Sequence, residues 1–186
     1  MINTAMSANT LREKIAKLII RIRKRQQKNT SQRINYADAE IVGVIYRRVN
    51  KTGASQVEDF IEKLQKDGKK VYSLEYIAKE IDSDYHLKEL NHFALRDEDL
   101  NFLKIPKKDI FNNFCNKKFD MLINLSLANH LQLHYIGALC RSSMKVGFYF
   151  EGYSDYYDFM VDAKGSLDFK EHANTMLSFI KQINKN

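Results

Sequence analysis

The 186-residue sequence contains few of the residues that cross-link or interrupt a fold. Its two cysteines, Cys115 and Cys140, are too few for the disulfide framework of a small secreted domain. We therefore expect two small buried side chains in a reducing compartment. One proline and seven glycines exclude collagen-like and Pro/Gly-rich disordered chains. The longest apolar run near the N-terminus, residues 18–20, is far shorter than the roughly 18 residues of a membrane span.

The sequence also lacks the short motifs that mark common α/β enzymes. The turn after the first predicted strand, residues 47–53, contains one glycine and neither GxGxxG nor GxxxxGK[ST]. No GxSxG, HExxH or CxxC occurs elsewhere. These absences argue against a Rossmann dehydrogenase, a P-loop NTPase, an α/β-hydrolase and a zinc enzyme. We expect no cofactor, no metal and no catalysis.

The positive charge is concentrated near the N-terminus. Residues 12–33 contain nine bases and one acid, a net +8, so the rest of the chain carries −1 of the total +7. The bases are interleaved with apolar residues up to position 28, unlike a secretory signal. The sequence therefore predicts a cytoplasmic bacterial protein with a basic arm over residues 1–35 and a single α/β domain over residues 36–186.

Residues 10–29 are predicted to form one helix of the arm. Leu11, Ile15, Leu18 and Ile22 follow one another at spacings of 4, 3 and 4, which places them on one stripe. Three interpretations of this basic helix stay open. It could bind RNA phosphates, lie on an anionic membrane, or pack its stripe on the body or on a second copy of the chain.

Strand and helix patterns alternate through the body. Residues 41–46 and 71–76 are predicted strands, and the helical spacing of residues 57–64 between them implies a right-handed parallel crossover. The sequence predicts a three-layer α/β sandwich with a mainly parallel, Rossmann-like sheet, preceded by the basic amphipathic N-terminal helix. The further predicted strands are 92–95, 119–125, 145–149 and 158–162, and the further predicted helices are 110–114, 131–141 and 166–184.

Polar residues follow the predicted central strand, where open α/β sheets bind ligands. Asn124 and Ser126 end this strand, and Tyr153 lies in an acidic, aromatic segment at another strand end. These three residues could line a ligand crevice. Alternatively, Ser126 or Asn129 caps the next helix, and the segment with Tyr153 packs as a loop or contacts the basic arm.

His130 and His134 are four residues apart and could face one side of a helix as metal ligands. No carboxylate or cysteine at ligand spacing completes such a site. A polar helix start is the favoured interpretation.

Four runs of the sequence are similar to a known but uncharacterised domain family. Residues 119–127, 133–139, 145–148 and 156–161 resemble a Bacteroidota family that also has a Lys/Arg-rich N-terminal helix. The resemblance covers most of the chain and implies no activity. That family is expected to have an aspartate where Asn124 stands, which weakens any acid–base or metal role there.

A second, partial resemblance covers residues 119–149. This part is similar to the N-terminal half of heptosyltransferase-type glycosyltransferases. The resemblance implies a degenerate small-molecule-binding half-fold without the nucleotide-sugar domain.

We predict a non-catalytic protein whose basic helix binds RNA on a ribosome or an assembling ribonucleoprotein. The predicted phosphate contacts are Lys17, Arg21, Arg23, Lys24, Arg25 and Lys28. One alternative is the small-molecule site at Asn124, Ser126 and Tyr153. A further alternative is a homo-oligomeric or membrane-surface scaffold held through Leu11, Ile15, Leu18 and Ile22, with no transmembrane segment.

Overall fold

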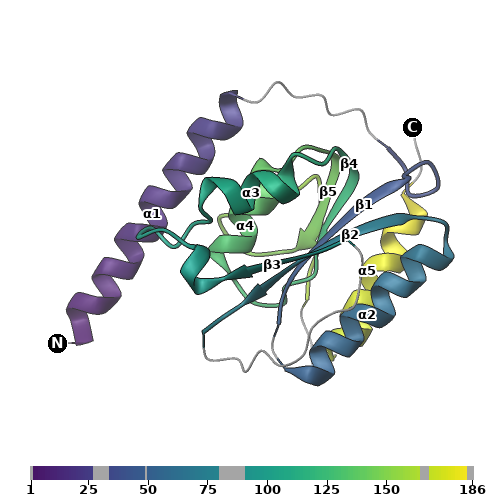
Figure 1. The fold of residues 1–186 in the computed structure, drawn as a ribbon, viewed down its shortest axis with the longest axis horizontal. Coiled ribbons are helices and arrows are strands. Elements are labelled where there is room, and N and C mark those ends of the chain that lie inside the picture. The colour runs from purple at the N-terminus through teal and green to yellow at the C-terminus, as the bar shows by residue number, and fades with distance from the viewer. Residues whose placement is uncertain (1, 27–33, 49, 80–90, 164–167, 184–186) are drawn as a thin grey trace.

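A computed structural model describes residues 2–26, 34–48, 50–79, 91–163 and 168–183. Its centre is a six-stranded sheet in the order β3-β2-β1-β4-β5-β6, with every pair of neighbours parallel (Figure 1). The predicted Rossmann-like α/β fold is confirmed. The strands are β1 (Ile41–Arg47), β2 (Lys70–Ile77), β3 (His92–Arg96), β4 (Phe119–Asn124), β5 (Ser142–Phe148) and β6 (Phe159–Val161).

Helices cover both faces of the sheet (Figure 1). One face carries α2 (Lys51–Lys66) and α5 (Phe169–Gln182), and the other carries α3 (Lys108–Cys115) and α4 (Leu131–Leu139). The acidic loop after β3 forms a short 3-10 helix, η1 (Asp97–Asp99), and a second one, η2 (Ser154–Tyr156), precedes β6. Each predicted strand and helix of the body is present, with its ends shifted by a few residues at most places.

Alternation along the strands divides the core into two layers. Val42, Val44 and Tyr46 of β1 pack toward α2 and α5, whereas Ile45 joins the cluster under α3 and α4. Both layers are buried because parallel strands covered on both faces have no solvent side. Gly43 fits this packing, since a Cβ atom there would lie 2.7 Å from Cδ1 of Leu122.

The N-terminal helix, α1 (Ile2–Gln26), packs outside α4, on the side away from the sheet (Figure 1). Ala16 and Ile20 are fully buried and share a cluster with Tyr135, Ala138 and Leu139. The stripe of Leu11, Ile15, Leu18 and Ile22 is exposed instead. The part of the stripe prediction in which these four residues pack on the body was therefore wrong. The small Ala16 and the branched Ile20, on the opposite face of α1, make the contact with α4 instead.

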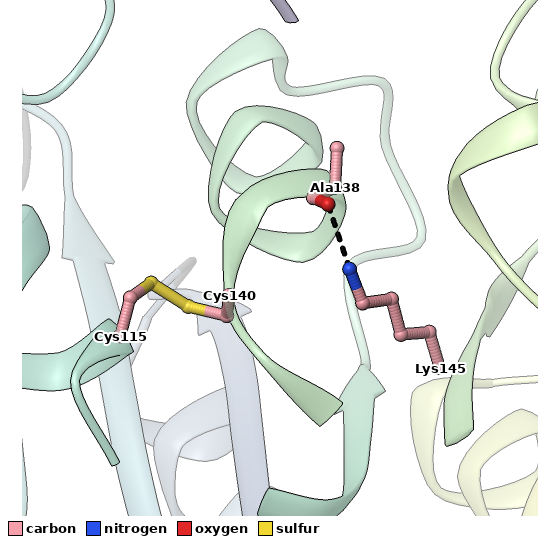
Figure 2. The surroundings of a disulfide bond; sticks show 4 residues. All are labelled: Cys115, Ala138, Cys140 and Lys145. Atoms are coloured by element: carbon pink, nitrogen blue, oxygen red, sulfur yellow. Dashed lines mark hydrogen bonds between the residues drawn. A yellow bond between two sulfur atoms is a disulfide. The ribbon is translucent and has the colours of Figure 1, made fainter. Parts of the chain in front are cut away.

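Cys115 and Cys140 are both buried, as predicted, but they are joined by a disulfide (Figure 2). The expectation of two unpaired cysteines was wrong. Cys115 ends α3 and Cys140 follows α4, and packing of the two helix ends brings their Cα atoms to 4.5 Å. The bond closes a loop with a sequence separation of 25 residues. Because the two cysteines are paired, they no longer support the expectation of a reducing compartment.

The same end of α4 is supported by a lysine from β5 (Figure 2). Nζ of Lys145 donates to the carbonyl oxygen of Ala138 at 2.7 Å, which satisfies a carbonyl in the last turn of α4. Burial, together with the nearby charge of Lys24, lowers the pKa of Lys145 to about 8. Its contact with the helix end assigns Lys145 a structural role.

Candidate functional site

The order in which strands are added to the sheet reverses between β1 and β4. From β1 the sheet grows through β2 to β3, and from β4 it grows the other way through β5 to β6. Connections from the two central strands therefore diverge at their carboxyl ends, which is where open α/β sheets leave a crevice. A cavity of about 330 Å³ lies there.

Both halves of the sheet contribute to this switch-point cavity. Arg47 is the last residue of β1, and Asn50 caps α2 by accepting a hydrogen bond from the backbone N–H of Gly53 at 2.8 Å. Ser126 and His130 enter from the loop after β4. The lining residues in full are Arg47, Asn50, Thr52, Gly53, Gln56, Val57, Leu125, Ser126, Leu127, Ala128, His130 and Phe169.

The electrostatics of the cavity favour an anion. Nη1 of Arg47 lies 3.4 Å from Nε2 of His130. Burial, and then the charge of Arg47, lowers the pKa of His130 to about 4, so the imidazole is neutral at neutral pH. The N-terminus of α2 adds partial positive charge at the rim. Among the described residues lining the cavity there is no carboxylate.

Of Asn124 and Ser126, the two residues of the predicted ligand crevice at the end of β4, only Ser126 lines this cavity. Asn124 is buried, and both ends of its amide have partners: Oδ1 accepts from the N–H of Ser126 at 3.0 Å, and Nδ2 donates to Oη of Tyr157 at 2.7 Å. It therefore shapes the loop after β4. Ser126 does not cap α4, because its hydroxyl donates to the carbonyl of Ala128 and the N-cap residue is His130.

Tyr153 lies away from the cavity and contacts the basic arm. Its hydroxyl donates to Oε1 of Glu13 at 2.8 Å, and Nζ of Lys17 lies 4.2 Å from the centroid of its ring. This arrangement confirms the alternative in which the segment of Tyr153 contacts the arm. The ring is buried and stacks on His134 at a centroid distance of 3.8 Å.

His134 belongs to this closed, aromatic region behind α4, although His130 faces the cavity one turn away. The hydroxyl of Tyr157 accepts from Asn124, so its proton is available to Nδ1 of His134 at 2.9 Å. Burial is the main cause that lowers the pKa of His134 to about 3. No group of three or more His, Cys, Asp or Glu side chains suited to a metal ion occurs among the residues described.

Because α1 docks on the body, some of the predicted RNA-binding residues have partners within the protein and others are exposed. Lys17 pairs with Glu13 at 2.9 Å, Arg23 donates to the hydroxyl of Tyr135, and Lys24 donates to the carbonyl of Asp155. Arg21 and Arg25 are exposed. Lys28 lies outside the described residues.

A second hollow, of about 450 Å³, lies between α1 and the start of α3. Its lining combines three cations with two aromatic rings: Arg23, Lys107, Lys108, Phe111 and Tyr135, joined by Asn101, Ile105, Pro106 and Asn112. Phe111 and Tyr135 meet edge to face, with ring centroids 5.5 Å apart.

Sequence reasoning missed Arg47 and Asn50 as site residues. The turn that contains them, residues 47–53, has one glycine and lacks the glycine-rich loop by which phosphate sites are usually recognised. The turn nevertheless contains a recognisable pattern. Arg47, a base at the end of a predicted strand, is followed by Asn50, which can cap the next helix. This turn borders a crevice only because β4 lies beside β1 in the sheet. The order of strands in a sheet depends on the tertiary fold and cannot be read from the local sequence.

Comparisons with known proteins agree with this fold. A model for a family of unknown function, DUF6913, matches residues 12–183. The chain belongs to this family. No curated protein matches it by sequence.

Among solved structures, the chain is similar to E. coli heptosyltransferase WaaC with ADP, at 10% identity and a TM-score of 0.53. The match covers 78% of this chain and 48% of the enzyme, so this chain spans about half of its length. At this identity the likeness shows the fold alone. None of the described helices is long and apolar enough to cross a membrane.

Proposed function

We propose that this protein binds a small anionic molecule, of the phosphate or phosphate-ester class, in the switch-point cavity. The observation that carries the proposal is the meeting of Arg47 with the capped N-terminus of α2 in one cavity at the carboxyl ends of β1 and β4. Backbone N–H groups at a helix N-terminus and a guanidinium are the donors that proteins use for phosphate.

The proposal is binding without catalysis. Ser126, a lining hydroxyl, donates to the backbone carbonyl of Ala128 and to no basic side chain among the described residues. The pKa of about 4 makes His130 a weak base, far from the value near 7 that suits a general acid or base, and no carboxylate occurs in the described lining. The ADP of the similar heptosyltransferase structure suggests a probe of suitable chemistry and no more.

Calorimetric titration with inorganic pyrophosphate and with ADP tests the proposal. Asn50→Asp keeps a side-chain oxygen to cap α2 but adds a negative charge at the cavity, so we expect roughly tenfold weaker binding at unchanged stability. Asn174→Asp, an exposed change on α5 outside the cavity lining, is the matched control and should bind as tightly as the wild type. Absence of binding to both probes, or equal affinity of Asn50→Asp, contradicts the proposal.

RNA binding is a second candidate function, and the hollow beside α1 favours it. Three cations and two aromatic rings in one groove are the combination that single-stranded nucleic acids bind through phosphate contacts and base stacking. The groove adds Lys107 and Lys108 to the basic residues of the arm, which the sequence did not associate with it.

A salt titration of oligouridine binding tests this candidate. Each phosphate neutralised contributes about 0.7 to the slope of log affinity against log salt for single strands. Lys107→Gln with Lys108→Gln should reduce that slope by about 1.4. Lys66→Gln with Lys170→Gln, on the opposite face of the sheet, should leave it unchanged. A flat salt response would reject RNA binding.

A cytoplasmic location is part of the same proposal and can be tested through the disulfide. Cells are quenched in acid, and their thiols are then alkylated under denaturing conditions, which expose both buried cysteines to the reagent. Mass spectrometry then reports whether Cys115 and Cys140 were oxidised before lysis. Alkylation of both residues without prior reduction supports a reducing compartment, and alkylation only after reduction contradicts it.

A further inference from the structure

We propose that the outer face of α1 binds an anionic lipid surface, with the helix lying in the plane of the interface. This face contains the outer stripe, defined as Leu11, Ile15, Leu18 and Ile22, whose exposed fractions are 59%, 39%, 56% and 49%. An apolar stripe of this kind on a helix with basic flanks is what interfacial helices insert at the headgroup boundary.

The body holds α1 with this stripe turned outward. The fully buried Ala16 and Ile20 lie on the face of the helix opposite to the outer stripe, at the 100° per residue of an α-helix. Arg23 and Lys24 donate to Tyr135 and to the carbonyl of Asp155 on either side of this contact. The side of α1 that would face water in a free interfacial helix is therefore covered by α4 and η2.

The charges beside the outer stripe select lipid over a second copy of the chain. Lys14, Arg21 and Arg25 border one side of the stripe and Arg12 borders the other, and all four are exposed. The one acid in this part of the chain, Glu13, faces the body, where Lys17 and Tyr153 bind it. Two such faces in contact would bring like charges together, whereas anionic headgroups neutralise them.

A neighbouring loop adds an exposed aromatic ring beside α1. Leu103 and Ile105 pack in the same cluster as Ala16 and Ile20, so this loop lies against the helix. Phe102, at the same turn, is 79% exposed, the largest exposed fraction among the large apolar side chains described. Phenylalanine is among the residues that anchor interfacial helices.

Flotation with lipid vesicles tests this inference on the full chain. The vesicles are phosphatidylcholine alone and phosphatidylcholine mixed with anionic phosphatidylglycerol. We expect binding to the anionic vesicles and little binding to the neutral ones. Leu18→Gln with Ile22→Gln should reduce the affinity at least about tenfold, because two inserted side chains are lost while glutamine keeps the helix propensity.

Two further variants make the result specific. Phe179→Gln, which removes an exposed apolar side chain of α5, should bind vesicles like the wild type. Arg21→Gln with Arg25→Gln should weaken binding to anionic vesicles and leave the thermal midpoint unchanged, since both residues are exposed. Equal binding by the stripe variant and the wild type would overturn the proposal.

The other occupants of this face give distinct results. A concentration-dependent dimer that the stripe variant abolishes, without vesicle binding, would make the outer stripe a self-association surface and overturn the proposal. Binding of oligouridine but not of vesicles would assign the bases to RNA and also overturn it. Pyrophosphate binding in the switch-point cavity does not enter this test, so the lipid proposal and the proposed function fail independently.

Discussion

His130 and His134 stand one turn apart at the start of α4 and belong to two different regions of the molecule. His130 faces the switch-point cavity beside Arg47. His134 is 1% exposed, stacks on Tyr153 and accepts a hydrogen bond from Tyr157 in a closed aromatic region that α1 covers. Both regions lie beside the carboxyl ends of neighbouring strands. The difference between the two regions is whether another segment covers them. Helix α1 covers the region of His134, which is therefore part of the core, and leaves the cavity of His130 open as a candidate site.

The largest expected effect is the loss of stability in acid that comes from His134. Its pKa is lowered to about 3 in the folded chain, while an unfolded histidine has a pKa of about 6.5, so the unfolded state binds the proton first. Stability is complete above pH 6.5 and is lost as the pH falls toward 3, by about 5 kcal/mol. Denaturant unfolding between pH 7 and pH 3 measures this loss.

His134→Gln should flatten the pH dependence between pH 6.5 and 4, because glutamine can still accept from Tyr157 but does not titrate. His130→Gln is the matched control. The pKa of His130 in the folded chain is about 4, so its contribution to the pH dependence ends near that pH. Between pH 4 and 3 this variant should therefore lose stability about as steeply as the wild type, whereas His134→Gln should lose less. Equal slopes of the two variants between pH 4 and 3 would show that the two regions do not differ as described.

The disulfide comes next, and it supports the closed region. The chain-entropy estimate for a loop of 25 residues is about 3.5 kcal/mol of stability. Cys115→Ser with Cys140→Ser should lose about that much in urea unfolding, and its affinity for pyrophosphate should not change. With reductant, the wild type should approach the stability of the variant. A stability that reductant leaves unchanged would show that the bond contributes nothing.

A smaller effect is expected from the hydroxyl that joins Asn124 to His134. Tyr157→Phe removes the acceptor of the Asn124 amide and the donor to His134, which leaves two buried polar groups without their partner and costs about 1–3 kcal/mol. Tyr149→Phe, at a ring that is 48% exposed, should change stability by less than about 0.5 kcal/mol. Equal unfolding free energies for the two variants would contradict the closed network.

The sequence alone predicted most strands and helices of the α/β domain, because each of them is marked by a local pattern of residues. Strands such as residues 41–46 and 119–125 are short runs of β-branched and apolar residues, and period and composition are enough to recognise them. The parallel crossover over residues 41–76 followed from the helix between two strands. The structure confirms these elements and the Rossmann-like class.

The sites were less predictable because they depend on contacts between distant segments. Tyr153 and Glu13 are 140 residues apart in the chain, and no local pattern shows that they meet. The stripe of Leu11 and Ile22 was correctly placed on one face. Among the side chains of α1 that the structure describes, however, the buried apolar ones are Ala16 and Ile20, on the face that docks. Periodicity marks the more apolar face of a helix and does not say which face has a partner.

The most direct test of the account is an NMR titration of the two imidazoles of α4, with and without pyrophosphate. A bound anion stabilises the imidazolium beside it, so the pKa of His130 should rise from about 4 when pyrophosphate binds. The pKa of His134 should change much less, because burial is the main cause of its low pKa and His134 does not line the cavity. If saturating pyrophosphate leaves the His130 titration unchanged, the switch-point cavity is not the anion site.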